Sequence, residues 1–139
     1  MTPTPLETPS TDLPDAERRR AYFARGRRCA AGLPTGFITA LRDCWSDAAG
    51  SHQRFAELVA ERGVWEVPLA VVDGALEVRY PRCFCHHLPA EPDEHYCECS
   101  RGWLAELLAR ISGDEYDVDL LCSVLRGADC CRLRARVVS

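Results

Sequence analysis

Hydrophobic residues recur at helical spacing through the first half of the chain. A helix is predicted over residues 12–32, with Asp12 as a candidate N-cap and Gly32 as the stop signal. Residues 36–45, and a third segment that ends at Gly63, show the same three- and four-residue spacing. The apolar positions are Phe37, Ile38, Leu41, Cys44 and Trp45 in one segment, and Phe55, Leu58 and Val59 in the other.

The pattern changes to an alternation with a period of two over residues 67–80. Asp73 and Gly74 at its centre suit a type I′ turn, so this segment is predicted to form a β-hairpin. In its second half, Leu76, Val78 and Tyr80 alternate with Glu77 and Arg79.

Another helix is predicted over residues 100–113, with Ser100 available as N-cap and Gly113 as the stop. Its apolar stripe consists of Trp103, Leu104, Leu107, Leu108 and Ile111.

Two strands are predicted at the C-terminus, over residues 115–125 and 130–138. The first places Tyr116, Val118, Leu120 and Cys122 on one face, opposite Asp117 and Asp119. The second places Cys131, Leu133, Ala135 and Val137 opposite a row of Arg132, Arg134 and Arg136. We interpret the arginine row as the solvated face of an edge strand. The expected fold class is α+β, with a helical N-terminal half and an antiparallel sheet on which one helix packs.

Length and composition fit one globular domain. The chain has 139 residues, of which 47% are hydrophobic and 27% are charged. Residues 1–11 contain three prolines and five threonine or serine residues, so we expect a disordered tail followed by a single domain over residues 12–139.

Charge and cysteine content restrict the function classes. A net charge of −4 disfavours a nucleic-acid partner, and the absence of lysine excludes Schiff-base chemistry on a lysine. Neither a secretory signal nor a membrane helix is apparent, so we expect a cytoplasmic protein with no membrane contact and with reduced thiols. Nine cysteines cannot all pair internally, which disfavours a disulfide framework.

The cysteines gather in residues 82–103, which contain two Cys-X-Cys pairs. In an extended chain alternate side chains point to the same side, so each pair would present two thiols together. Four such thiolates favour zinc, with an iron–sulfur cluster as the alternative. The predicted metal ligands are Cys83, Cys85, Cys97 and Cys99, and a histidine from His86, His87 and His95 could replace one of them.

Two other interpretations of the cysteines stay open. Reduced cysteines are often buried as small hydrophobic residues, which we expect for Cys44, Cys122 and Cys29. Alternatively, Cys97 or Cys99 is a catalytic nucleophile, because both precede the predicted helix start and Arg101 would help to lower a thiol pKa there. His52, outside the cluster, is interpreted as a surface helix residue.

The second half of the chain resembles the 4-vinyl reductase domain family and its cysteine-rich bacterial relatives. The segments that carry the resemblance are "DGALEVRYPRCFC", "YCECSRGWLAELLARISGDEYDVDL" and "SVLRGADCCRL", within roughly residues 70–138. Gly102 matches the family's helix glycine, and Cys97 or Cys99 matches the cysteine before it. Gly127, Cys131 and Leu133 match the closing motif, with Ala128 in place of an acidic residue and leucine in place of phenylalanine.

The resemblance implies a fold similar to heme–nitric-oxide-binding domains, built around an apolar pocket. It also implies a small-molecule-binding module, often with cysteines suspected of holding metal. We therefore expect a binding module for a small apolar molecule with a zinc site, and a homodimer is one assembly that the sequence allows. The alternative is a cysteine-dependent hydrolase or reductase that acts on a small molecule.

Overall fold

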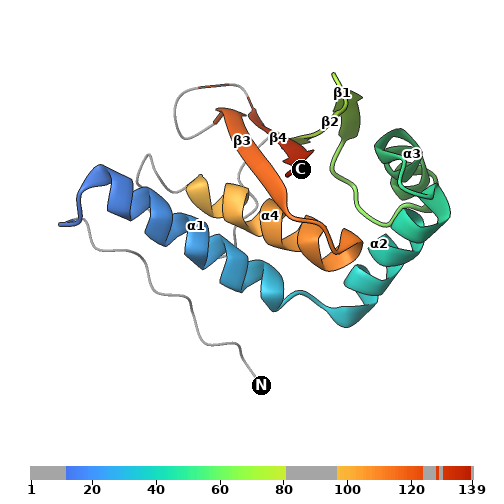
Figure 1. Cartoon of the computed structure of the whole chain (residues 1–139), viewed down its shortest axis with the longest axis horizontal. Helices are drawn as coiled ribbons and strands as arrows, with labels where there is room; N and C mark the ends of the chain where they lie inside the picture. Colours follow the sequence, from blue (N-terminus) through green and yellow to red (C-terminus); the bar gives the residue numbers. More distant parts are fainter. Residues whose placement is uncertain (1–11, 81–96, 124–127, 129, 139) are drawn as a thin grey trace.

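The computed structural model describes residues 12–80, 97–123, 128 and 130–138. These residues form an α+β fold, as the hydrophobic pattern predicts (Figure 1). In chain order the elements are α1 (Asp15–Ala31), α2 (Thr35–Ala48), α3 (His52–Arg62), β1 (Leu69–Val72), β2 (Ala75–Tyr80), α4 (Glu98–Ser112), β3 (Tyr116–Cys122) and β4 (Cys131–Val137). The predicted tail over residues 1–11 lies outside the described residues.

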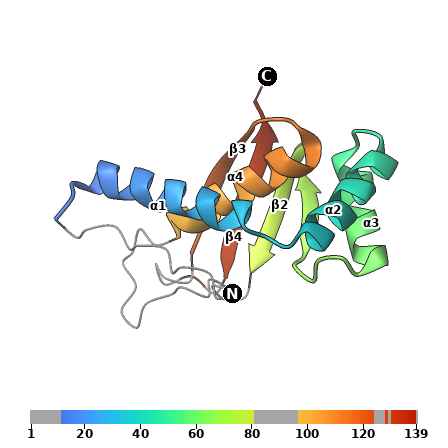
Figure 2. The ribbon, with the colours of Figure 1, turned by 90° about the horizontal axis from the view of Figure 1, so that it is seen from below.

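The described strands form one antiparallel sheet in the order β1-β2-β4-β3. Helix α4 packs on one face of this sheet, and α1 lies along α4 on the side away from the strands (Figures 1 and 2). Helix α2 contacts α4, and α3 lies next to β1. The core lies between α4 and the sheet and continues onto α2 and α3. It includes Leu104 and Leu107 of α4 and Leu76, Val78 and Leu133 of the strands.

Glycines end several helices where the sequence predicts. Gly32 follows α1, and Gly63 and Gly113 follow α3 and α4 with left-handed backbone (φ of 62° and 80°). The predicted starts are less accurate. Helix α1 begins after Pro14, so the cap at Asp12 is wrong, and α4 begins after Cys97, so the cap at Ser100 is also wrong. A helix C-terminus that needs left-handed backbone strongly favours glycine. The residue before the first turn of a helix is less restricted, so the helix start is harder to predict.

The predicted hairpin is confirmed. Asp73 and Gly74 join β1 to β2, and both have positive φ (52° and 78°), as a type I′ turn requires. The turn aligns the two strands so that Val71 pairs with Leu76 and Leu69 pairs with Val78. All four side chains belong to the core or pack against it.

Strand β4 lies between β2 and β3, so our interpretation of it as an edge strand is wrong. Two of its arginines, Arg132 and Arg134, are also less exposed than a solvated row would be, because they enclose an acid. The Glu77 carboxylate on β2 is 6% exposed and accepts hydrogen bonds from Arg132 Nε at 2.8 Å and Arg134 Nη2 at 3.1 Å. The hydrogen bond from Arg132 is the main reason that the pKa of Glu77 lies below its usual range.

Helices α1 and α4 cross at very short range because each has a glycine at the crossing. A Cβ atom on Gly26 would lie 1.9 Å from the carbonyl oxygen of Cys99, and one on Gly102 would lie 1.9 Å from that of Phe23. Any larger residue at either position would overlap the backbone of the opposite helix. This reciprocal contact gives a structural reason for a glycine at position 102.

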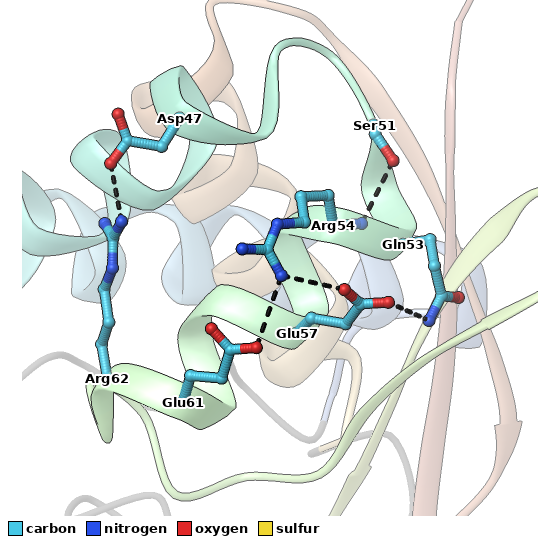
Figure 3. A network of polar contacts seen from close by, with 7 residues as sticks. All are labelled: Asp47, Ser51, Gln53, Arg54, Glu57, Glu61 and Arg62. Atoms are coloured by element: carbon cyan, nitrogen blue, oxygen red, sulfur yellow. Dashed lines mark hydrogen bonds and ion pairs between the residues drawn. The ribbon is translucent and has the colours of Figure 1, made fainter.

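Polar contacts fix helix α3 against the end of α2 (Figure 3). The Ser51 hydroxyl caps α3 by accepting the backbone N–H of Arg54 at 3.1 Å, and Arg62 forms an ion pair with Asp47 at 2.7 Å. The Arg54 guanidinium lies 3.0 Å from Glu57 and 3.4 Å from Glu61. These ion pairs are exposed, so each contributes little on its own, and the cap is the stronger local determinant.

Candidate functional site

The cysteine segment is described only in part. Cys83, Cys85 and the three histidines between the Cys-X-Cys pairs lie outside the described residues. Cys97 and Cys99 are described. Cys97 is the N-cap residue of α4 and already has helical backbone angles (φ −65°, ψ −12°), and Cys99 lies in the first turn of that helix. The extended backbone expected for this pair is therefore wrong. In a helix, residues two apart point in different directions, so these thiols are not presented together by their backbone.

Cys97 faces the sheet side of the molecule. It is 1% exposed, and its Sγ lies 2.7 Å from the hydroxyl oxygen of Ser123, itself 1% exposed. Ser123 directly follows β3, so this contact joins the start of α4 to the end of that strand. The partner of the Cys97 sulfur in this contact is a neutral hydroxyl.

Cys99 faces α1 and has a charged partner. Its side chain is 6% exposed, and the Arg25 guanidinium donates from Nη1 to Cys99 Sγ at 3.2 Å. Arg25 is 2% exposed, and a guanidinium stays charged at any ordinary pH. A positive group beside a cysteine stabilises the thiolate, the form that binds metals and attacks electrophiles.

Tyr22, one helical turn before Arg25, shares this buried environment. Burial raises the pKa of the Tyr22 hydroxyl, and the nearby Cys99 sulfur raises it further. Arg18 and Arg25 act in the opposite direction. The first turn of α4 therefore contacts a region of α1 that is charged and polar as well as buried.

Arg101, the positive group that the sequence predicts near these thiols, makes its contacts elsewhere. Its guanidinium forms an ion pair with the buried Glu98, and its Nε donates to the Val118 carbonyl at 2.7 Å. It also lies 5.2 Å from the centre of the Phe23 ring. Arg25 was missed because it precedes Cys99 by 74 residues, and only the glycine pair in α1 and α4 hints at so close a contact.

The other described cysteines have varied surroundings. Cys44 is 0% exposed in the core, which confirms its interpretation as a small hydrophobic residue. Cys29 and Cys122 are partly exposed, so full burial was wrong for both. Cys131 is 3% exposed and Cys130 is partly exposed.

The four-cysteine metal site stays a prediction. Within the described part of the chain, no group of three or more histidine, cysteine, aspartate or glutamate side chains is arranged to hold a metal ion. Two of the four predicted ligands, Cys83 and Cys85, are outside that part, so the complete ligand set is not represented there.

His52 is the first residue of α3, so its interpretation as a helix residue is confirmed, and its side chain is partly buried at the surface. Its Nε2 lies 2.8 Å from the Tyr116 hydroxyl oxygen, and its ring lies 5.2 Å from that of Trp45. Burial lowers the pKa of His52, and Asp114 partly opposes this effect. The residue connects the start of α3 to the start of β3.

Comparison with known proteins identifies the fold. No protein-family model matches the chain, and no curated protein matches it. A solved structure does match, that of an H-NOX protein from S. oneidensis in the Fe(II)NO ligation state, with a TM-score of 0.51 and 14% sequence identity. This chain has an H-NOX-like fold.

The match covers 88% of this chain and 66% of the H-NOX protein, so the chain spans a little under two thirds of that protein's length. At this identity the likeness concerns the fold, which agrees with the architecture that the family resemblance implies. The 4-vinyl reductase resemblance itself stays a prediction. Among the helices in the described ranges, none is long and apolar enough to cross a membrane.

Proposed function

We propose that residues 12–139 form a small-molecule-binding module that holds a metal ion, zinc in the first instance, through cysteine thiolates. An iron–sulfur cluster is the alternative occupant of the same ligands. The proposed ligands are Cys83, Cys85, Cys97 and Cys99.

The contact between Arg25 and Cys99 carries this proposal. A metal binds the thiolate form of cysteine, and a buried guanidinium at 3.2 Å from the sulfur favours that form. Hydrogen bonds to metal ligands also orient them and tune their affinity, and both described sulfurs have such a neighbour. Burial of both thiols suits a ligand role better than a catalytic role, because reactive cysteines are usually accessible.

The small-molecule part of the proposal is supported by the fold. The H-NOX protein of the comparison holds iron with nitric oxide bound. Among the described residues, no histidine is available to bind such an iron. His52, the one histidine among them, packs its ring against Trp45 and contacts Tyr116 through Nε2. We therefore base the site on thiolates and propose a small apolar molecule as the ligand.

One observation favours a second candidate, a cysteine-dependent hydrolase or reductase. The two described thiols differ, since Cys99 has a guanidinium at 3.2 Å and Cys97 has a hydroxyl at 2.7 Å. A catalytic cysteine is activated individually, whereas the members of a ligand set are equivalent in function. Cys99 is the candidate nucleophile, with Cys97 as the other choice.

Elemental analysis and an absorption spectrum of anaerobically purified protein test the metal proposal. We expect about one zinc per chain, or the visible absorption of an iron–sulfur cluster. Cys99→Ser should lose the metal, whereas Cys44→Ala, which changes a core thiol, should retain it. Folded wild-type protein without metal or colour would contradict the proposal and favour the enzyme.

A further inference from the structure

The end of strand β3 contains an irregularity that reorients Cys122. Leu120 pairs with Leu133, but Cys122 pairs with Arg132, so two steps along β3 correspond to one step along β4. Leu121 is the extra residue of a β-bulge. Without the bulge, Cys122 would continue the inward-facing series of Tyr116, Val118 and Leu120. With it, Cys122 shares the outward face of Arg132, and Ser123 takes the buried position.

Cys130 lies on the same outward face. It directly precedes Cys131, which is 3% exposed and starts the inward-facing series of β4. Cys130 is partly exposed, as is Cys122. The hydrogen bond to Glu77 raises the pKa of the outward-facing Arg132 guanidinium, and both cysteines lie close enough to raise it further. Both carry free thiols.

Two contacts hold these positions together. The backbone N–H of Ala128 donates to the Ser123 carbonyl at 3.0 Å, which returns the chain to the end of β3. The Cys122 thiol donates from Sγ to the Cys130 carbonyl at 3.3 Å. The Cys122 side chain therefore already rests against residue 130.

The charge around the pair is consistent with two neighbouring sulfurs. Burial raises the pKa of the Cys122 thiol, and the proximity of Cys130 raises it further. A raised pKa keeps the Cys122 thiol protonated at neutral pH, which suits the second step of an oxidation better than the first.

We propose that Cys122 and Cys130 form a dithiol site that peroxides convert to a disulfide. In the first step the Cys130 thiol attacks a peroxide, giving a sulfenic acid at Cys130 and releasing the alcohol or water. In the second step the Cys122 sulfur attacks the sulfenic sulfur, loses its proton and forms the S–S bond, and the hydroxyl leaves as water. The two thiols are oxidised by two electrons and the peroxide is reduced by two.

This site is separate from the proposed metal ligands. Cys97 faces Ser123 on the inward side of the sheet and Cys99 faces α1, whereas the dithiol is on the outward side. The proposal stands whether or not the chain binds a metal.

Peptide mapping of the full chain after treatment with hydrogen peroxide tests the proposal. Trypsin cleaves after arginine, so Cys122 falls in peptide 111–126, and Cys130 with Cys131 in peptide 127–132. We expect these two peptides to be joined in unreduced samples, with fragmentation placing the bond on Cys130, and to separate on reduction. The Cys29→Ser variant, which removes another partly exposed thiol, should form the same link.

The Cys122→Ser variant provides the second measurement. It should keep its circular dichroism spectrum and form no link, and a sulfenic-acid reagent should then label Cys130. A bond from Cys122 to Cys131 or to peptide 83–101 would overturn the proposal. So would unlinked peptides whose two cysteines are each oxidised or alkylated separately.

Discussion

Two groups of cysteines lie near the same end of the sheet and differ in almost every physical respect. Cys97 and Cys99 are buried at the start of α4, and their sulfurs contact a hydroxyl and a guanidinium. Cys122 and Cys130 are partly exposed on the outward face, and the contact between them is from thiol to backbone. Burial and polar contacts suit the first group to the proposed role of metal ligands. Partial exposure suits the second group to the proposed reaction with peroxides.

The difference arises from backbone geometry and not from residue type. Cys130 and Cys131 are neighbours in sequence, yet Cys130 is partly exposed just before β4 and Cys131 is buried at the start of that strand. The bulge at Leu121 likewise exchanges the expected positions of Cys122 and Ser123. The substitutions of Gly102, Arg25 and Glu77 each disturb one side of this comparison, and Cys44→Ala disturbs neither.

The largest effect is expected from Gly102→Ala. The new Cβ would lie 1.9 Å from the Phe23 carbonyl oxygen, so α1 and α4 must move apart. Cys99, which is buried against α1, would then become exposed. We expect a loss of about 3 kcal/mol or more in the free energy of unfolding, measured by urea denaturation. Gly36→Ala is the matched control, because a Cβ there meets nothing within 4 Å. Equal stability of the two variants would refute the close crossing.

Arg25→Met tests the charged contact to Cys99 directly. Removing the guanidinium should lower metal affinity by ~10–100-fold in a competition with a chelator, as loss of a hydrogen-bond partner to a ligand does. Arg27→Met is the control, because Arg27 is exposed on the same helix, where it forms an ion pair with Glu106 at 3.6 Å and lies 5.9 Å from the centre of the Phe23 ring. If Arg25→Met leaves the metal affinity unchanged, Arg25 does not contribute to the metal site.

Glu77→Gln tests the outward face, where the carboxylate holds Arg132 next to Cys122. We expect a cost of about 1–3 kcal/mol in unfolding free energy at neutral pH. The folded-state pKa of Glu77 is depressed, so its contribution is present above its unfolded pKa, near 4.5, and is lost as the pH falls through the folded value. The variant should therefore lose less stability than wild type on acidification. Identical pH profiles would contradict this account of Glu77.

The smallest effect is expected from Cys44→Ala. This thiol is fully buried in the core, so its truncation should cost on the order of 1 kcal/mol in thermal or urea unfolding. Metal content should not change, because Cys44 is on α2 and belongs to neither group of cysteines. Loss of metal in this variant would mean that the site is misplaced.

Features that depend on local backbone could be predicted from the sequence. The stops at Gly63 and Gly113 and the turn at Asp73 and Gly74 each need positive φ, which few residues adopt, so the residue type reveals the conformation. Alternation correctly assigned Leu76, Val78 and Leu133 to the core face. These assignments together establish the α+β class.

Features that depend on spatial neighbours could not be predicted in the same way. The alternation of hydrophobic and polar residues predicts which side chains of β4 share a face, but not the position of β4 between β2 and β3. The hydrogen bond from Arg132 to Glu77 therefore could not be predicted. The bulge at Leu121 adds one residue without a sequence signal. The helical start at Cys97 was missed because Ser100 is also an acceptable cap, and this misplaced the two thiols of the second Cys-X-Cys pair.

A timed reaction with iodoacetamide, followed by mass spectrometry with and without a chelator, tests the thiolate metal site most directly. Cys122 is the internal reference, because it is partly exposed and outside the ligand set. If Cys83, Cys85, Cys97 and Cys99 hold one ion, all four should resist alkylation, and chelation should expose them together and destabilise the fold. One cysteine of the four that reacts quickly and ignores the chelator would contradict the metal site and identify a nucleophile instead.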